Sequence, residues 1–237
     1  MNTVIIVQAR TSSTRLPNKV LLKISNKTLL EYHVERARKS KLPIIVATSE
    51  DSRDDAIIKV GNTLAVSIFR GDLNNVLKRF YLCALKYKVD IIIRTTADCP
   101  LVDGELIKDG FIEFKKTSAD YLSNTLIRTY PRGFDFEIFT FAALEKAFRS
   151  VHNSTDREHV TPYILSHNDA FRIKQHTRLP NKSDYRLTVD TLKDLAVIKI
   201  LIEKYHADEK NCNEIIDILD AHPEIVNINK SVQQKTV

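Results

Sequence analysis

The chain has 237 residues, 43% of them hydrophobic and 28% charged, and a formal net charge of +6 at pH 7. This length and composition are typical of a globular protein with a substantial core, and they argue against a disordered or membrane-spanning chain. No apolar run approaches the roughly 18 residues that cross a bilayer, and no basic leader precedes the first apolar stretch, so we expect a cytoplasmic protein. Three widely spaced cysteines (Cys83, Cys99 and Cys212) indicate reduced thiols.

The first apolar stretch, residues 3–7, is β-branched and bounded by polar residues, which predicts a buried strand of a parallel sheet. It leads into a loop that carries Arg10, Arg15 and Lys19, four hydroxyl residues at positions 11–14, and no acid. Guanidinium and hydroxyl donors match the geometry of phosphate oxygens. The loop therefore predicts a triphosphate-binding site, with a solvated basic turn as the alternative.

Helices and strands alternate along the first half of the chain. This alternation predicts a mostly parallel sheet with right-handed crossovers and helices on both faces. After the first strand, the expected elements are a helix at 29–37, a strand at 43–48, a short helix at 54–61, a strand at 64–69, a helix at 76–85 and a strand at 91–93.

Each of the four predicted strands ends in a polar segment. Because the carboxyl ends of parallel strands share one edge of the sheet, and ligands bind at that edge, these segments should converge on one pocket. The segments are 10–19, 48–51, 70–72 and 94–98.

The second half of the chain is less regular. An irregular excursion at 121–132 precedes a half-exposed strand at 134–139, and helices are expected at 141–148, 156–166, 191–205 and 212–221, with strands at 171–176 and 185–189. No repeat or linker marks a boundary, so we expect one domain over residues 1–229 and a polar, frayed tail over residues 230–237.

Two acids, Asp98 and Asp190, stand where predicted strands end. An acid pair beside a basic phosphate loop suits a Mg²⁺-nucleotide site, because Mg²⁺ takes hard oxygen ligands and the phosphates complete its shell. Alternatively, Asp190 caps the helix that follows it, and Asp98 starts a turn. His159 lies in a charged cluster and either contacts a ligand or satisfies a partly buried helix face. No glycine-rich phosphate-binding motif is present, so phosphate binding must depend on Arg, Lys and hydroxyl groups.

The loop residues Gln8-Ala9-Arg10, 13–17 and Lys19 resemble the signature loop of sugar cytidylyltransferases, the group that contains the KDO and acylneuraminate cytidylyltransferases. Asn18 stands where that loop usually has glycine, and asparagine tolerates a left-handed backbone better than most residues. The likeness is strongest to the spore-coat polysaccharide biosynthesis protein F branch, and it runs from about residue 3 to about residue 200. Further segments that resemble this branch, in order, are 47–49, 69–72, 76–79, 94–101, 130–135, 157–163 and 189–195.

The resemblance implies a three-layer α/β/α nucleotidyltransferase fold of the glycosyltransferase-A type with a mostly parallel central sheet. It implies transfer of CMP from CTP to a sugar or sugar-acid acceptor with release of pyrophosphate, in surface polysaccharide or glycan biosynthesis. It also implies Mg²⁺ and a homodimer, with no nucleic acid or membrane as partner.

The same resemblance assigns roles residue by residue. The implied catalytic residues are Arg15, Lys19, Asp98 and Asp190, of which Asp98 and Asp190 would bind Mg²⁺. The implied nucleotide-binding residues are Arg10, Ser13, Thr14, Arg15, Lys19, Thr48, Ser49, Asp51, Arg70 and Thr96. The implied acceptor-binding residues are Arg79, Arg94, Arg132, Asp135, Glu137 and His159.

Two other functions stay open from the residues alone. A glycosyltransferase of the same fold would use a nucleotide-sugar donor and release no pyrophosphate, although such enzymes often carry an Asp-x-Asp motif that this sequence lacks. A non-catalytic protein that binds nucleotides or nucleic acid would account for the positive charge, and it would bind polyanions in a salt-sensitive way.

Overall fold

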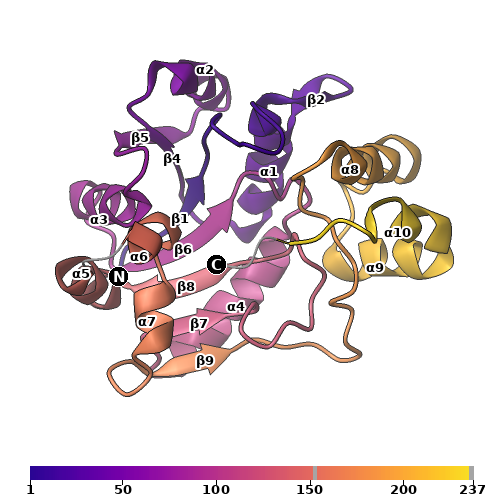
Figure 1. Cartoon of the computed structure of the whole chain (residues 1–237). Helices are drawn as coiled ribbons and strands as arrows, with labels where there is room; N and C mark the ends of the chain where they lie inside the picture. Colours follow the sequence, from indigo (N-terminus) through magenta and orange to yellow (C-terminus); the bar gives the residue numbers. More distant parts are fainter. Residues whose placement is uncertain (152–153, 235–237) are drawn as a thin grey trace.

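A seven-stranded sheet forms the centre of the computed structural model, which describes residues 1–151 and 154–234 (Figure 1). Its strands are β1 (Thr3–Gln8), β4 (Ile44–Ser49), β5 (Ser67–Gly71), β6 (Ile91–Thr96), β7 (Tyr121–Ser123), β8 (Glu137–Thr140) and β9 (Ile173–Gln175), and a separate ribbon consists of β2 (Lys23–Ile24) and β3 (Lys27–Thr28). The helices are α1 (Leu29–Ala37), α2 (Asp55–Thr63), α3 (Val76–Lys86), α4 (Gly104–Lys116), α5 (Phe141–Ser150), α6 (Ser154–His159), α7 (Pro162–Ser166), α8 (Leu192–Tyr205), α9 (Cys212–Ala221) and α10 (Pro223–Asn229).

The strand order in the sheet is β5-β4-β1-β6-β8-β7-β9, and β8 is the strand that runs antiparallel to its neighbours. β4 pairs with one edge of β1, and β5 pairs with β4. The next strand of this sheet in the chain, β6, pairs with the other edge of β1. The order of the strands therefore reverses beside β1. In open parallel sheets, ligands bind at such a reversal, outside the carboxyl ends of the strands.

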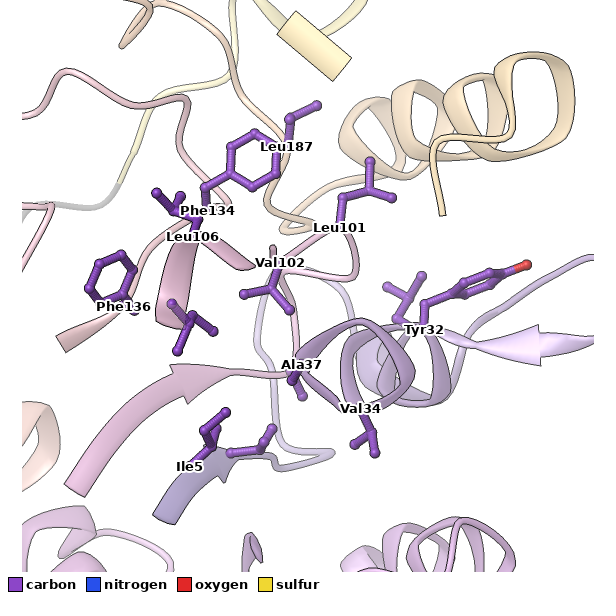
Figure 2. Close-up of a cluster of buried hydrophobic side chains, with 14 of the residues drawn as sticks. Ile5, Tyr32, Val34, Ala37, Leu101, Val102, Leu106, Phe134, Phe136 and Leu187 are labelled. Atoms are coloured by element: carbon purple, nitrogen blue, oxygen red, sulfur yellow. The ribbon is translucent and has the colours of Figure 1, made fainter. Parts of the chain in front are cut away.

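Side chains of β1 alternate between two hydrophobic cores, one on each face of the sheet, because successive residues of a strand point to opposite sides. Ile5 and Val7 pack with α1, α4, α8 and α9, whereas Val4 and Ile6 pack with α3, α5 and α7. Figure 2 shows part of the first core, to which Ile5 of β1 and Val34 and Ala37 of α1 all belong. The prediction of a mostly parallel sheet between two helical layers is confirmed.

Two predicted strands begin later in the structure than in the sequence pattern. Residues 64–66 precede β5 in a turn in which Ala65 has a positive φ of 51°. Before β8, the side chain of Asn124 donates to the carbonyl of Phe134 at 2.9 Å and accepts from the amide of Phe136 at 3.0 Å. A side chain thus takes the place of a neighbouring strand at these positions.

The predicted strand at 185–189 is wrong. This segment makes one isolated bridge, between Arg132 and Arg186, because its backbone partners change along its length. The amide of Leu187 donates to the carbonyl of Arg132 at 2.6 Å, and the amide of Val189 donates to the carbonyl of Asp98 at 2.8 Å. The segment therefore links two loops and brings Asp190 next to Asp98.

Two helices, α4 and α10, were not predicted, and the predicted helix at 156–166 is divided into α6 and α7 at Val160, whose φ is 70°. After α10 the chain turns back toward the central sheet (Figure 1). Of the predicted tail, residues 235–237 lie outside the described residues, whereas the Ser231 hydroxyl accepts a hydrogen bond from Lys193 at 3.1 Å. Within the described chain, no helix combines the length and the hydropathy that crossing a membrane requires.

Candidate active site

A cleft of about 570 Å³ opens at the carboxyl ends of β1 and β6, where the strand order reverses. The predicted segments 10–19 and 94–98 contribute to its wall, together with residues from the second half of the chain. The described residues that line it are Gln8, Arg10, Ser12, Ser13, Thr14, Arg15, Lys19, Val20, Thr96, Asp98, Cys99, Arg132, Asp135, Glu158, His159, Thr188, Asp190 and Gln234.

The loop after β1 closes tightly on itself. The carbonyl of Thr11 accepts hydrogen bonds from the amides of Ser13 and Asn18, both at 2.9 Å. Asn18 adopts the left-handed conformation with φ 58°, which confirms that asparagine can replace glycine in this turn. A 3₁₀ turn, Lys19–Leu21, follows and points the Lys19 side chain into the cleft.

Asp54, which is 1% exposed, anchors the start of this loop. Its carboxylate accepts from the amide and hydroxyl of Thr11 at 2.8 and 2.6 Å, from the Thr48 hydroxyl at 3.0 Å, and from the amide and hydroxyl of Ser49. Burial raises the pKa of Asp54, but the hydrogen bonds from Ser49 and Thr11 outweigh burial and hold the pKa below its usual value. Thr48 and Ser49 therefore help to fix the loop.

Lys19 lies between two acids that come from distant parts of the chain. Its ammonium is 2.6 Å from Oδ2 of Asp98 and 2.7 Å from Oδ1 of Asp190. Burial lowers the pKa of Lys19, but attraction by Asp98 and Asp190 outweighs this effect and raises it. Burial likewise raises the pKa of Asp98, and Lys19 brings it below the usual value. The pair is therefore charged at neutral pH.

Asp190 binds two further cations. Arg15 and Arg186 approach its Oδ2 at 2.7 and 2.8 Å. Asp190 does not cap the following helix, because the N-cap residue of α8 is Thr191, which forms a capping box with Asp194. The Asp190 side chain lines the cleft instead.

Three predicted acceptor-side residues line the cleft: Arg132, Asp135 and His159. Asp135 is bound by the fork of Arg128 at 2.6 and 3.0 Å, while no hydrogen bond or ion pair of the Arg132 guanidinium is found within the described residues. Burial lowers the pKa of Arg132, as do the neighbouring cations Arg128 and Arg186. Burial also lowers the pKa of His159.

The other predicted acceptor-side residues lie outside the cleft wall. Arg94 binds Glu137 and the side chain of Gln8, and Glu137 also accepts from the hydroxyls of Tyr121 and Thr161. Arg79 is fully buried, and none of its three side-chain nitrogens has a hydrogen-bond partner in the described chain. Burial lowers the pKa of Arg79 to about 10.

Some of the predicted nucleotide-binding residues line the cleft, and others do not. Arg10, Ser13, Thr14 and Thr96 line the cleft with Arg15 and Lys19. Asp51 instead binds the Arg53 side chain at 2.6 Å, and Arg70 binds Asp55 at 2.9 Å and the carbonyl of Ser49 at 2.9 Å. Thr48, Ser49, Asp51 and Arg70 are not among the residues that line the cleft.

Sequence reasoning missed Arg186, Thr188 and Gln234 in this part of the molecule. A signal was present for two of them, because residues 186, 188 and 190 of an extended chain lie on one face. Thr188 and Asp190 line the cleft, and Arg186 contacts Asp190. Gln234 reaches the cleft from the tail and accepts a hydrogen bond from Arg186 at 2.6 Å.

Comparison with known proteins identifies the family of the chain. A sequence model of the family described as Cytidylyltransferase matches residues 4–220. The chain is 41% identical to an uncharacterized protein of Methanocaldococcus jannaschii, over 98% of this chain and 96% of that one. It is 33% identical to the spore coat polysaccharide biosynthesis protein SpsF of Bacillus subtilis, over 92% of this chain and 94% of that one.

Among solved structures, a cytidylyltransferase from Leptospira borgpetersenii superposes with a TM-score of 0.92 at 33% identity, covering 100% of this chain and 99% of that chain. The resemblance seen in the loop 10–19 and in the later segments is therefore confirmed over nearly the whole chain. The protein belongs to the cytidylyltransferase family and has its nucleotidyltransferase fold.

Proposed function

We propose that this protein transfers CMP from CTP to a hydroxyl of a sugar or sugar-acid acceptor and releases pyrophosphate, in the biosynthesis of a surface polysaccharide or glycan. Membership of the cytidylyltransferase family supports the reaction, and the similarity to SpsF of Bacillus subtilis supports the pathway. The observation that carries the proposal is the cluster in which Lys19 joins Asp98 to Asp190 inside a cleft rich in cations.

The loop 10–19 supplies the groups that would hold a triphosphate. Arg10, Arg15 and Lys19 provide positive charge, and Ser13 and Thr14 provide hydroxyl donors on the same wall of the cleft. Within the described residues Arg10 has one weak partner, Glu158 at 3.4 Å, so a phosphate can recruit it at small cost. Direct contacts of Thr48, Ser49, Asp51 and Arg70 with the nucleotide stay a prediction.

The donor set fits Mg²⁺. Asp98 and Asp190 offer hard carboxylate oxygens that already share one cation, the Lys19 ammonium. No cluster of three potential protein ligands occurs among the described residues, but Mg²⁺ is commonly held by one or two carboxylates together with substrate phosphates and water. A metal ion bound by Asp98 and Asp190 would neutralise negative charge on the α-phosphate and polarise it toward attack.

In this reaction the acceptor oxygen attacks the α-phosphorus in line, and the bond from the α-phosphorus to the bridging oxygen of pyrophosphate breaks. Arg15 and Lys19 would neutralise the charge that develops on the leaving pyrophosphate. Both cations already line the cleft, where they are bound to Asp190.

The acceptor would lie on the side of the cleft formed by Arg132, Asp135 and His159. Because no partner of the Arg132 guanidinium is found within the described residues, this group could bind an acidic group of the acceptor. Roles of Arg79, Arg94 and Glu137 in acceptor binding stay predictions, as does the homodimer implied by the family.

The proposal is tested by incubating the protein with CTP, Mg²⁺ and a panel of sugar acids, phosphorylated sugars and polyols, with pyrophosphate as the readout. At least one acceptor should give pyrophosphate with CTP, and ATP, GTP or UTP should give less. A glycosyltransferase would instead consume a nucleotide-sugar donor without releasing pyrophosphate. Absence of pyrophosphate across the whole panel would overturn the proposed reaction.

A further inference from the structure

Asp194, which is fully buried, lies directly beneath Asp190 and holds its backbone. Oδ2 of Asp194 accepts hydrogen bonds from the amides of Asp190 and Thr191, at 3.0 and 2.9 Å, and from the Thr191 hydroxyl at 2.9 Å. Oδ1 accepts from the side-chain amide of Asn229 at 3.0 Å. This carboxylate therefore fixes the start of α8 and the residue before it.

Arg186 joins this buried acid to the acid in the cleft. Its Nε donates to Oδ1 of Asp194 at 2.8 Å, and one terminal nitrogen donates to Oδ2 of Asp190 at 2.8 Å. The Arg186 side chain is 8% exposed. A guanidinium fork bound to two acids has a fixed orientation that a lysine ammonium cannot reproduce.

The two oxygens of Asp190 consequently have different partners. Oδ2 receives Arg186 and Arg15, whereas Oδ1 receives the ammonium that it shares with Asp98. Asp190 is held through its backbone by Asp194 and through Oδ2 by Arg186. Its remaining oxygen is directed toward the cation between the two acids.

We infer that Arg186 is a positioning residue that, anchored on Asp194, orients Asp190 so that Oδ1 faces a cation shared with Asp98. The inference rests on the proposed function in that the shared cation would be the metal that accompanies CTP. Partners that orient a metal-binding carboxylate typically contribute about 10-fold to 100-fold to metal affinity or activity.

A role in charge neutralisation alone would have a different signature. If Arg186 merely offset the negative charge of Asp190, replacing it by lysine would preserve metal affinity, and replacing it by glutamine would strengthen binding of a cation. A positioning role predicts that both replacements weaken binding. The lysine variant separates geometry from charge because it keeps the charge and loses the fork.

The experiment measures binding of Mn²⁺ alone, from the electron paramagnetic resonance signal of the free ion, for the wild type, Arg186→Lys and Arg186→Gln. The matched control is Arg172→Lys, because Arg172 forms a comparable fork on Asp120, at 3.2 and 3.3 Å, at an exposed site. Melting temperatures are recorded for every variant. We expect the dissociation constant for Mn²⁺ to rise at least about 10-fold in both Arg186 variants and to stay unchanged in the control.

Absence of Mn²⁺ binding by the wild type, unchanged affinity in a folded Arg186→Lys protein, or tighter binding in Arg186→Gln would each overturn the inference. If neither Arg186 variant folds, Asp194→Glu is measured instead, since it keeps the anchoring charge and moves the carboxylate. Weaker Mn²⁺ binding by folded Asp194→Glu supports positioning, and unchanged affinity overturns it. Pyrophosphate release is assayed in parallel: its absence from a wild type that binds Mn²⁺ contradicts the proposed function and leaves the inference intact.

Discussion

Two buried aspartates, Asp54 and Asp190, contact opposite ends of the loop 10–19 and are held by opposite kinds of partner. Asp54 accepts hydrogen bonds from neutral hydroxyls and backbone amides of Thr11, Thr48 and Ser49. Asp190 is bound by the side chains of Lys19, Arg15 and Arg186. They are 1% and 6% exposed, so burial does not distinguish them.

The difference lies in what a ligand could displace. The donors to Asp54 are backbone amides and short side chains of β4 and of the loop after β1, so these bonds are part of the fold. The side chains of Lys19 and Arg15 are long and charged and line the cleft, and a triphosphate can draw them away from Asp190, whereas Arg186 stays bound to Asp194. An acid held by neutral donors is thus part of the fold, whereas an acid held by cations that a ligand can recruit belongs to a binding site.

The largest expected effect comes from breaking the cluster around Lys19. Lys19→Ala and Asp98→Asn should each lower the rate of pyrophosphate release by at least about 100-fold, because preorganised charge at the reacting phosphates is lost. Steady-state assays with CTP and an acceptor identified in the panel measure this. Lys23→Ala, which changes an exposed lysine on β2, serves as the control. Undiminished turnover in Lys19→Ala would remove the assignment of this cluster.

Asp54→Asn should act on stability. The amide presents donors to groups that are already donors, and we expect the free energy of unfolding to fall by about 3 kcal/mol. Urea denaturation of the wild type and the variant gives this value. A loss below about 1 kcal/mol would show that Asp54 is not the structural anchor described above.

The pH dependence of stability provides a second test of the role of Asp54. The pKa of Asp54 lies below its usual 3.8 in the folded protein, so its contribution is complete above the unfolded value and is lost as the pH falls through the lower folded value. The free energy of unfolding should therefore fall more steeply below about pH 4 in the wild type than in Asp54→Asn. Parallel curves for the two proteins would contradict this expectation.

Arg132→Ala should weaken binding of the acceptor and leave binding of CTP unchanged. Because the guanidinium has no partner within the described chain, its removal should leave the fold intact and raise the acceptor KM about 10-fold, the loss expected for one charged hydrogen bond. The KM for CTP should change less than about twofold. A rise in the KM for CTP with an unchanged KM for the acceptor would contradict this assignment and indicate that Arg132 binds the nucleotide.

The smallest effect is expected at Asn18. Its φ of 58° favours asparagine or glycine over alanine, so Asn18→Ala should cost about 1 kcal/mol of stability, and Asn18→Gly should differ from the wild type by about half of that or less. Thermal unfolding followed by circular dichroism distinguishes the two variants. Equal melting temperatures would show that the turn tolerates alanine.

Strong periodic patterns made much of the fold predictable. The alternation of strands and helices up to residue 96 and the position of the basic loop follow from such patterns. Helix α4 was missed although Leu106, Ile107 and Phe114, which are buried on one face, recur at helical spacing. The segment 185–189 looks like a strand because Tyr185, Leu187 and Val189 alternate with polar residues, but strand pairing depends on neighbours that the local sequence does not reveal.

The site was predictable where charge was unusual and less so where polar residues are common. Lys19, Asp98 and Asp190 stand out because strong charges follow predicted strands. Thr48 and Ser49 look like equally good ligands in the sequence, and only the structure shows that the buried Asp54 takes up their hydroxyls. The sequence does not single out Arg186, because its contacts with Asp190 and Asp194 depend on the position at which α8 begins, Leu192.

Transfer of a labelled α-phosphate is the most direct test of whether this protein transfers CMP. The protein is incubated with CTP labelled at the α-phosphorus, Mg²⁺ and an acceptor, and the products are separated. We expect the label to move into the acceptor in equal amount to the pyrophosphate released, and Lys19→Ala to abolish both. Label recovered only in free CMP or CDP, or transfer that persists undiminished in Lys19→Ala, would contradict it.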